Sequence, residues 1–229
     1  SIKPIHSLVS YIMDGVGKPD VIVDGYNSPH GFSLKPSHAK MLENADLVIW
    51  VGEDLEAFLE KPLKTITKKA INIELLDLKR INKLEFREKN IFEEHDDHKE
   101  HDDHKEHDDH KEKDAHEGHN HGEHDPHVWL DPINAKIIVK EITKELIKLD
   151  SKNSSVYKSN SKKALADIDK LIKSIRKDLN KDLRFVVFHD AYQYYENRFG
   201  IQVLGALTVN TDVMPGAEQL SEIREVIEH

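Results

Sequence analysis

The sequence contains no cysteine. Disulfide bonds are therefore excluded, and so are metal sites built on thiolate ligands. Long apolar runs are also missing: the longest, Leu47–Val51, is far shorter than the roughly 20 residues of a membrane-spanning helix. Ser1 begins directly in a patterned region without a visible signal segment. We therefore expect the natural N-terminus, with any removed targeting segment, to lie further upstream.

The chain also has no excess of positive charge. Its formal net charge is −10, and residues 93–125 alone hold fifteen Asp and Glu against four Lys, so the rest of the chain sums to +1. A protein that binds nucleic acid usually shows a basic patch. The composition therefore predicts no nucleic-acid partner.

What the chain has in abundance is histidine. Eleven of the sixteen histidines lie between His95 and His127, and the hexad His-Asp-Asp-His-Lys-Glu is repeated three times over residues 95–112. This tract has almost no apolar side chains, so we expect a disordered histidine-rich loop over residues 93–124. Its closely spaced imidazoles and negative charge fit a loose collector of metal cations, although a solvated charge run without a role is the alternative.

On both sides of the tract, short β-branched runs alternate with helical patterns. Before the tract we expect strands at 21–23, 47–51 and 71–76, with helices at 5–16, 36–45 and 54–69, the last interrupted near Pro62. After it we expect two long helices, the second about 25 residues long, then strands at 184–188 and 201–207, a helix at 191–199 and a last helix from Gly216 onward.

This order predicts the α/β class, with two lobes built on parallel-type sheets and joined by a long backbone helix. The expected domains are an N-terminal metal-binding lobe at 1–150, a linking helix at 151–181 and a partial C-terminal lobe at 182–229. The last segment holds too few elements to bury a core by itself. We therefore expect it to be the front half of a larger lobe.

Three histidines outside the repeats stand at special places. His30 and His189 follow predicted strands, at the edge where open α/β sheets bind ligands, and Asp190 is placed to cap the next helix. His127 lies between two Asp-Pro pairs. Neutral imidazole is a usual ligand of Zn²⁺, so we predict that His30, His127 and His189 share a metal site. His6 and His38 lie within helical patterns and are interpreted as ordinary surface residues.

Five segments carry a resemblance to a known family: residues 1–9, 28–37, 45–52, Asp-Pro-His-Val-Trp-Leu-Asp-Pro at 125–132, and Phe-His-Asp-Ala-Tyr at 188–192. Together they resemble the zinc-binding solute-binding proteins of bacterial metal ABC transporters (ZnuA type), over essentially the whole chain except the tract. The resemblance implies that the histidines matching His30, His127 and His189 bind Zn²⁺ between two lobes. Histidine rather than an acidic residue at position 189 favours the zinc branch over the manganese and iron branch.

What the resemblance implies is capture of Zn²⁺ and its delivery to a membrane permease, by a monomer in the periplasm or lipid-anchored on the outer face of the cytoplasmic membrane. Two departures stand out. The family's acidic fourth ligand falls beyond residue 229, so three imidazoles and a water are expected here. Some zinc members also have a Glu before the first histidine, where this chain has Pro29.

Three other functions remain open on the sequence. A manganese- or iron-binding relative could use a similar cleft, and a stand-alone zinc buffer would need no permease. A zinc hydrolase could also use three histidines and an open water position. It would need a general base, for which Asp131 and Asp190 are the candidates, but no substrate pocket is indicated, and we predict that the protein is not an enzyme.

Overall fold

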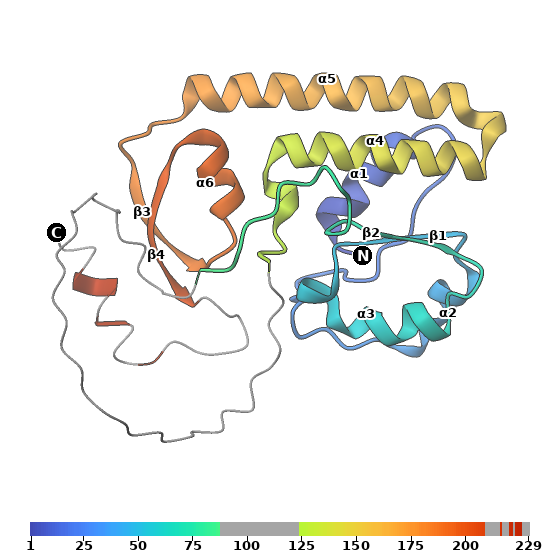
Figure 1. Ribbon diagram of the computed structural model, residues 1–229, viewed down its shortest axis with the longest axis horizontal. Coiled ribbons are helices and arrows are strands. Elements are labelled where there is room, and N and C mark those ends of the chain that lie inside the picture. Colours follow the sequence, from blue (N-terminus) through green and yellow to red (C-terminus); the bar gives the residue numbers. More distant parts are fainter. Residues whose placement is uncertain (88–123, 209–215, 217–219, 222, 226–229) are drawn as a thin grey trace, which may run out of the picture.

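The computed structural model describes residues 1–87, 124–208, 216, 220, 221 and 223–225. The repeats of the histidine-rich tract, and most of the helix expected after Gly216, lie outside these residues. Two groups of short parallel strands lie on either side of the view in Figure 1, and one long helix runs above both. This arrangement confirms the α/β class and the two-lobe architecture.

The N-terminal half contains one βαβ unit flanked by helices. Strands β1 (Leu47–Trp50) and β2 (Ile71–Glu74) are joined through helix α3 (Glu53–Thr65) and pair in parallel, with Leu47 opposite Ile71. Helices α1 (Lys3–Met13) and α2 (Pro36–Asn44) precede them. Val48, Ile49 and Trp50 are all buried, as expected for a strand covered on both faces.

The strand predicted at 21–23 was wrong. Only one residue pairs, in a parallel bridge between Ile2 and Val23. The amides of Ile22 and Val23 both donate to the carbonyl of Ser1, at 3.2 and 3.1 Å, while the Ser1 nitrogen donates to the carbonyl of Ile49 at 3.2 Å. Residues 1 and 2 therefore lie between Val23 and β1. So short a segment cannot support a continuous ladder.

The interruption of α3 was predicted at the wrong residue. Pro62 lies within a helix that continues to Thr65, and the non-helical backbone is at Glu56, with φ −126° and ψ 48°. Glu56 is fully buried, and its carboxylate accepts a hydrogen bond from the Val51 amide at 2.7 Å. The kink in α3 therefore lies at a buried side chain that accepts the backbone amide of Val51, the residue after β1.

Two long helices follow the tract. A short 3₁₀ turn, η1 (Val128–Leu130), leads into α4 (Pro132–Leu149), which is capped by Asp131 through a 2.8 Å bond from the Ile133 amide. A second turn, η2 (Ser151–Asn153), then leads into α5 (Ser154–Asp178). As predicted, α5 has 25 residues, and it packs on α4 and α1 (Figure 1).

The C-terminal half contains the second βαβ unit. Strands β3 (Arg184–His189) and β4 (Gln202–Thr208) pair in parallel around α6 (Gln193–Phe199). Gly200, with φ +67°, ends α6 in the left-handed conformation that glycine adopts most easily. Helix α6 begins at Gln193 rather than at 191, and its N-cap is Tyr192. The prediction that Asp190 caps this helix was therefore wrong.

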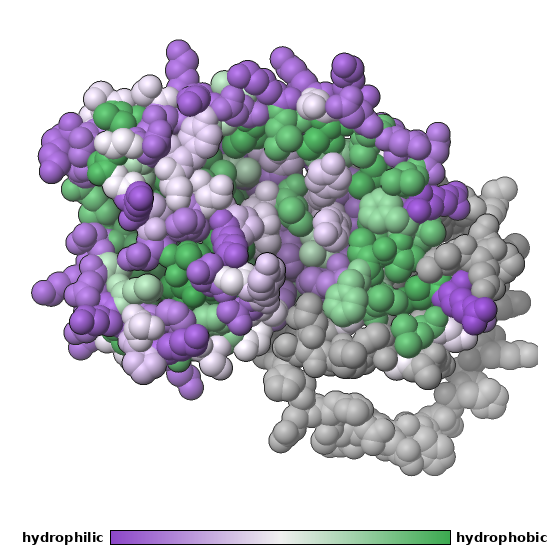
Figure 2. All heavy atoms as spheres, turned by 180° about the vertical axis from the view of Figure 1, so that it is seen from behind, coloured by the Kyte–Doolittle hydropathy of each residue, from purple (hydrophilic) through white to green (hydrophobic). Residues whose placement is uncertain are grey.

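The core lies mainly in the N-terminal half, between the β1–β2 sheet and helices α1, α3 and α4, and Tyr194 of α6 joins it. The β3–β4 half carries exposed apolar side chains, including Leu183 and Phe188, which are 56% and 62% exposed. Apolar surface also gathers on this half in the reverse view of Figure 2. Among the described residues, no helix is both long and apolar enough to span a membrane.

Candidate metal centre

Three histidines from distant parts of the chain meet between the two halves. His30 lies in the turn after residues 24–28, His127 immediately precedes η1, and His189 is the last residue of β3. One ring nitrogen from each lies within 4.8 Å of the other two. His127 is buried, and the other two are partly exposed. This is the only such group of three ligating side chains among the described residues.

The rings face one another at several angles rather than stacking. Ring centroids are 5.7 Å apart for His30 and His127, 5.2 Å for His30 and His189, and 5.1 Å for His127 and His189. The Nε2 atoms of His127 and His189 are 3.3 Å apart. Since bonds from zinc to imidazole nitrogen are about 2.0–2.1 Å, one ion can lie between nitrogens at this separation.

Asp125 orients His127 from behind. Its Oδ1 accepts the backbone amide of His127 at 2.9 Å and lies 2.7 Å from the ring Nδ1. Both residues are almost fully buried. An ionised carboxylate only accepts hydrogen bonds, so Nδ1 carries the hydrogen, and in the neutral ring Nε2 then keeps its lone pair. A carboxylate behind a ligating histidine is a frequent partner in metal sites, because it fixes the ring and increases its basicity.

His189 is held in its neutral form. Burial lowers the pKa of its imidazole to about 4, with a further contribution from neighbouring His127. Its Nδ1 is buried and makes no hydrogen bond of standard geometry within the part of the chain that the structure describes. A neutral ring is required for ligation, so His189 is ready to bind metal at neutral pH.

Asp131 and Asp190, the two candidate general bases, each lie against an arginine. Arg198 donates to both carboxylate oxygens of Asp131, at 2.7 and 2.5 Å. Arg87 donates to Asp190 at 3.1 Å. Burial raises the pKa of Asp190 to about 6, and Arg87 acts in the opposite direction. These two ion pairs connect residues from the two halves of the chain.

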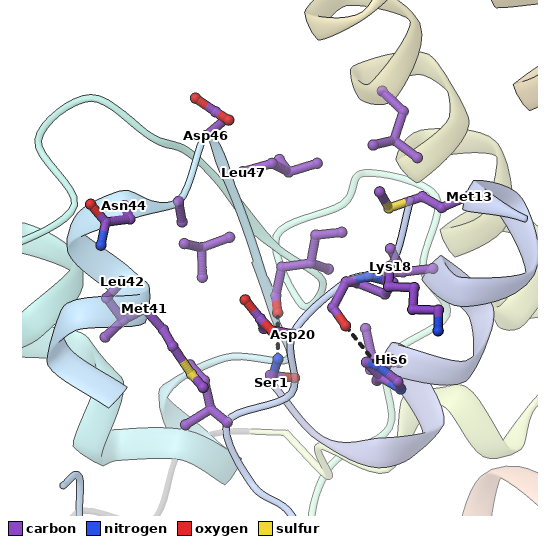
Figure 3. Close-up of a pocket in the computed structure, with 18 of the residues that line it drawn as sticks. Ser1, His6, Met13, Lys18, Asp20, Met41, Leu42, Asn44, Asp46 and Leu47 are labelled. Carbon is purple, nitrogen blue, oxygen red and sulfur yellow. Dashed lines mark hydrogen bonds between the residues drawn. The ribbon is translucent and has the colours of Figure 1, made fainter. Parts of the chain in front are cut away.

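The remaining predicted and unassigned features lie elsewhere. His6 is 3.0 Å from the Pro19 carbonyl, and Nδ1 of His38 accepts the Lys35 amide at the start of α2. A groove of about 820 Å³ lies between α1, α2 and β1 (Figure 3). None of the three clustered histidines lines it. The groove and the candidate metal centre are therefore separate places.

The sequence interpretation did not find Asp125 as a partner of His127, nor Arg87. For Asp125 a signal was present, because an Asp two residues before a buried position commonly accepts that residue's amide. For Arg87 there was none: its partners Asp190 and Glu196 are 103 and 109 residues away.

Comparison with known proteins gives a consistent picture. The family model described as zinc-uptake complex component A periplasmic (ZnuA) matches residues 1–229. The high-affinity zinc uptake system protein ZnuA of Brucella abortus is 46% identical over 239 residues, covering 99% of this chain and 72% of the relative. The protein of the same name from Yersinia pestis is 36% identical over 233 residues, covering 100% and 71%.

Solved structures show the same fold at lower identity. A crystal structure of ZnuA superposes with a TM-score of 0.76 at 22% identity, covering all of this chain and 76% of that one. A Mn-bound periplasmic metal-binding protein from Candidatus Liberibacter asiaticus gives 0.70 at 22% identity, covering 100% and 73%. The family match over the full length, and the relatives that share more than a third of their residues, lead to one conclusion: the chain belongs to the ZnuA family of periplasmic zinc-uptake components.

Proposed function

We propose that this protein captures Zn²⁺ outside the cytoplasmic membrane and delivers it to the permease of a metal ABC transporter. The observation that carries the proposal is the convergence of His30, His127 and His189, with one nitrogen of each within 4.8 Å of the others. Family membership supplies the transport role, since the relatives are named as zinc uptake proteins. Zinc here is the cargo and not a resident cofactor.

The ligand set favours zinc over manganese. Imidazole nitrogen suits Zn²⁺, whereas Mn²⁺ prefers oxygen ligands and binds N-donor sites less tightly. The Mn-bound neighbour shows that the fold itself does not select the metal. We infer that selection comes from the three imidazoles, completed by a water or by an acidic side chain from outside the described residues.

We propose binding without catalysis. Both carboxylates that could act as a general base next to a metal-bound water, Asp131 and Asp190, are paired with arginines. In this proposal the protein acts as a periplasmic monomer, free or lipid-anchored. Because α5 packs along α1 and α4 of the N-terminal half before leading to β3, it restrains the relative movement of the halves. Release of zinc is then triggered by docking on the permease.

Metal analysis tests the proposal directly. Protein purified without added metal should contain zinc in preference to manganese and iron by inductively coupled plasma mass spectrometry. In competition with a zinc chelator, one tight site per chain should persist after the looser metal of the histidine-rich tract has been removed. Manganese retained in preference to zinc would point to the manganese branch. Zinc-dependent turnover of esters would instead support the hydrolase.

A further inference from the structure

Two of the clustered histidines belong to different halves of the protein, so something must set the separation between their rings. His127 follows the tract, and His189 ends β3. Residues 84–87 contact the surroundings of both histidines. We call this segment the neck, because it leads toward the tract. It contains no helix and only one bridging residue, Glu85.

On one side the neck is fixed to the segment that holds His127. The Asp125 amide donates to the Leu84 carbonyl at 2.8 Å, and Glu85 forms an antiparallel bridge with His124. Asp125 is also the residue whose carboxylate orients the ring of His127. The neck is therefore hydrogen-bonded directly to Asp125, the residue that orients His127.

On the other side the neck is fixed to α6. The Tyr194 hydroxyl accepts the Leu84 amide at 3.0 Å and donates to the Asp125 carbonyl at 2.7 Å, so one side chain joins both segments. Gln193 donates to the carbonyl of Glu85 at 2.9 Å. Tyr194 is 1% exposed and Gln193 is 8% exposed, which indicates a packed contact.

Arg87 completes the connection to His189. Its guanidinium donates to Asp190 at 3.1 Å and to both oxygens of Glu196, at 3.1 and 2.9 Å. Asp190 and Glu196 are each 6% exposed. Two carboxylates buried together are unfavourable without a cation that donates hydrogen bonds to both. The planar fork of arginine can do so, whereas a lysine presents only a point charge.

We propose that Arg87 is a positioning residue for the metal site, because it holds Asp190, and through the backbone the adjacent His189, at ligating distance from His127. The neck then acts as the strut between the two ligands. This inference rests on the proposed zinc function. It assigns Arg87 no contact with the metal itself.

The test compares two arginines that both bridge the halves. Arg87→Gln removes the contacts to two buried carboxylates, Asp190 and Glu196, whereas Arg198→Gln removes the contact to one, Asp131 at the start of α4. Within the described residues the hydrogen bonds of the Arg198 side chain go to Asp131 and not to the neck or to Asp190. Both full-length variants are titrated with zinc against a chelator that occupies only the tight site. The same proteins are loaded with Co²⁺, whose visible absorption is strong for four-coordinate and weak for six-coordinate sites.

Zinc affinity should fall at least about tenfold in Arg87→Gln, the range known for partners behind metal ligands, with a weakened Co²⁺ absorption. Arg198→Gln should keep its Co²⁺ spectrum and lose much less affinity. Equal losses in both variants, or no loss in Arg87→Gln, would overturn the inference.

If Arg87→Gln does not fold, Arg87→Lys tests whether Arg87 positions His189. It keeps the charge and loses the fork, so affinity should fall while the melting temperature of the metal-free protein changes little. Unchanged affinity in a folded Arg87→Lys would also overturn the inference. Failure of the proposed function is distinguishable, because the unmodified protein would then show no tight zinc site at all.

Discussion

The Nε2 atoms of His127 and His189 lie 3.3 Å apart although 62 residues separate them in the sequence. At this distance the two nitrogens can share a proton in a hydrogen bond, or both can direct lone pairs at one cation. With His30, the pair forms the only group of three metal-ligating side chains among the described residues.

His127→Ala should abolish the tight zinc site and leave only loose binding. Two remaining imidazoles make a poor sphere for a metal that takes at least three protein ligands in open sites. Competition with a zinc chelator measures the effect. The matched control is His38→Ala, which removes an imidazole at the start of α2, outside the site. Tight binding in the His127 variant equal to that of the control would remove His127 from the site.

Asp125→Asn should weaken zinc binding by about 10- to 100-fold. The amide can still accept a hydrogen bond from the His127 backbone, but it has lost the negative charge that supports the ring. Isothermal titration in the presence of a competing chelator gives the ratio. If affinity is unchanged, the 2.7 Å contact between Asp125 and the ring serves the fold alone.

Tyr194→Phe should destabilise the protein by about 1–3 kcal/mol, because the Leu84 amide and the Asp125 carbonyl each lose a hydrogen-bond partner in a buried place. Urea unfolding of the metal-free protein measures this. Tyr195→Phe is the control, since the neighbouring ring packs on Phe199 with centroids 4.7 Å apart. A difference of less than a few tenths of a kcal/mol between the two variants would contradict the structure.

Glu74 predicts a pH effect far from the metal centre. Burial raises the pKa of its carboxyl group to about 7, with repulsion from Asp77 and Glu53 adding to the effect. The folded state therefore binds a proton more tightly than the unfolded chain, and the associated stability is lost as the pH rises through about 7. Glu74→Gln should raise the melting temperature relative to the unmodified protein at pH 8 more than at pH 5.

Glu60→Gln is the control for that experiment. The Lys64 ammonium beside Glu60 lowers the pKa of its exposed carboxyl group, so neutralising it should bring no gain at high pH. A Glu74 variant that follows the control at both pH values would show that the carboxyl group titrates normally.

Deleting residues 93–123 should reduce the number of zinc ions bound per chain without removing the tight site. The deletion keeps His124, because it bridges with Glu85 next to the metal centre. Metal content after dialysis and thermal unfolding give the two readouts. Loss of the tight site, or of cooperative unfolding, would mean that the tract contributes to the folded core.

Local patterns were sufficient for most of the helices. They also singled out the three histidines that the structure brings together, although the strand expected before His30 is only a single bridge. Each of these histidines lies at the end of a recognisable element or beside a proline, and such positions can be identified from a few neighbouring residues in the sequence. Residues 21–23 show where a local pattern is insufficient to predict a strand. Their β-branched side chains fit a strand, but a strand also needs a partner, and here only Ser1 and Ile2 lie alongside.

The supporting residues needed information that a local pattern does not hold. Asp190 could cap a helix or pair with a cation, and the choice depends on Arg87, which is 103 residues away. Glutamate is almost never fully buried unless it is paired, yet Glu56 is fully buried and accepts the Val51 amide. In each case the tertiary neighbour decides the role of a side chain whose chemistry allows several.

The separation of the three candidate ligands along the chain also sets an order of events during folding. His30 and His127 come well before His189 in the sequence, and His189 follows the 25-residue helix α5. Bringing such distant residues together costs loop-closure entropy that only the finished fold repays. A chain that has not folded therefore cannot hold an ion with all three histidines until β3 is in place. Zinc held by all three histidines would then be found only on folded chains. Zinc would stabilise the completed fold without directing the early steps of folding.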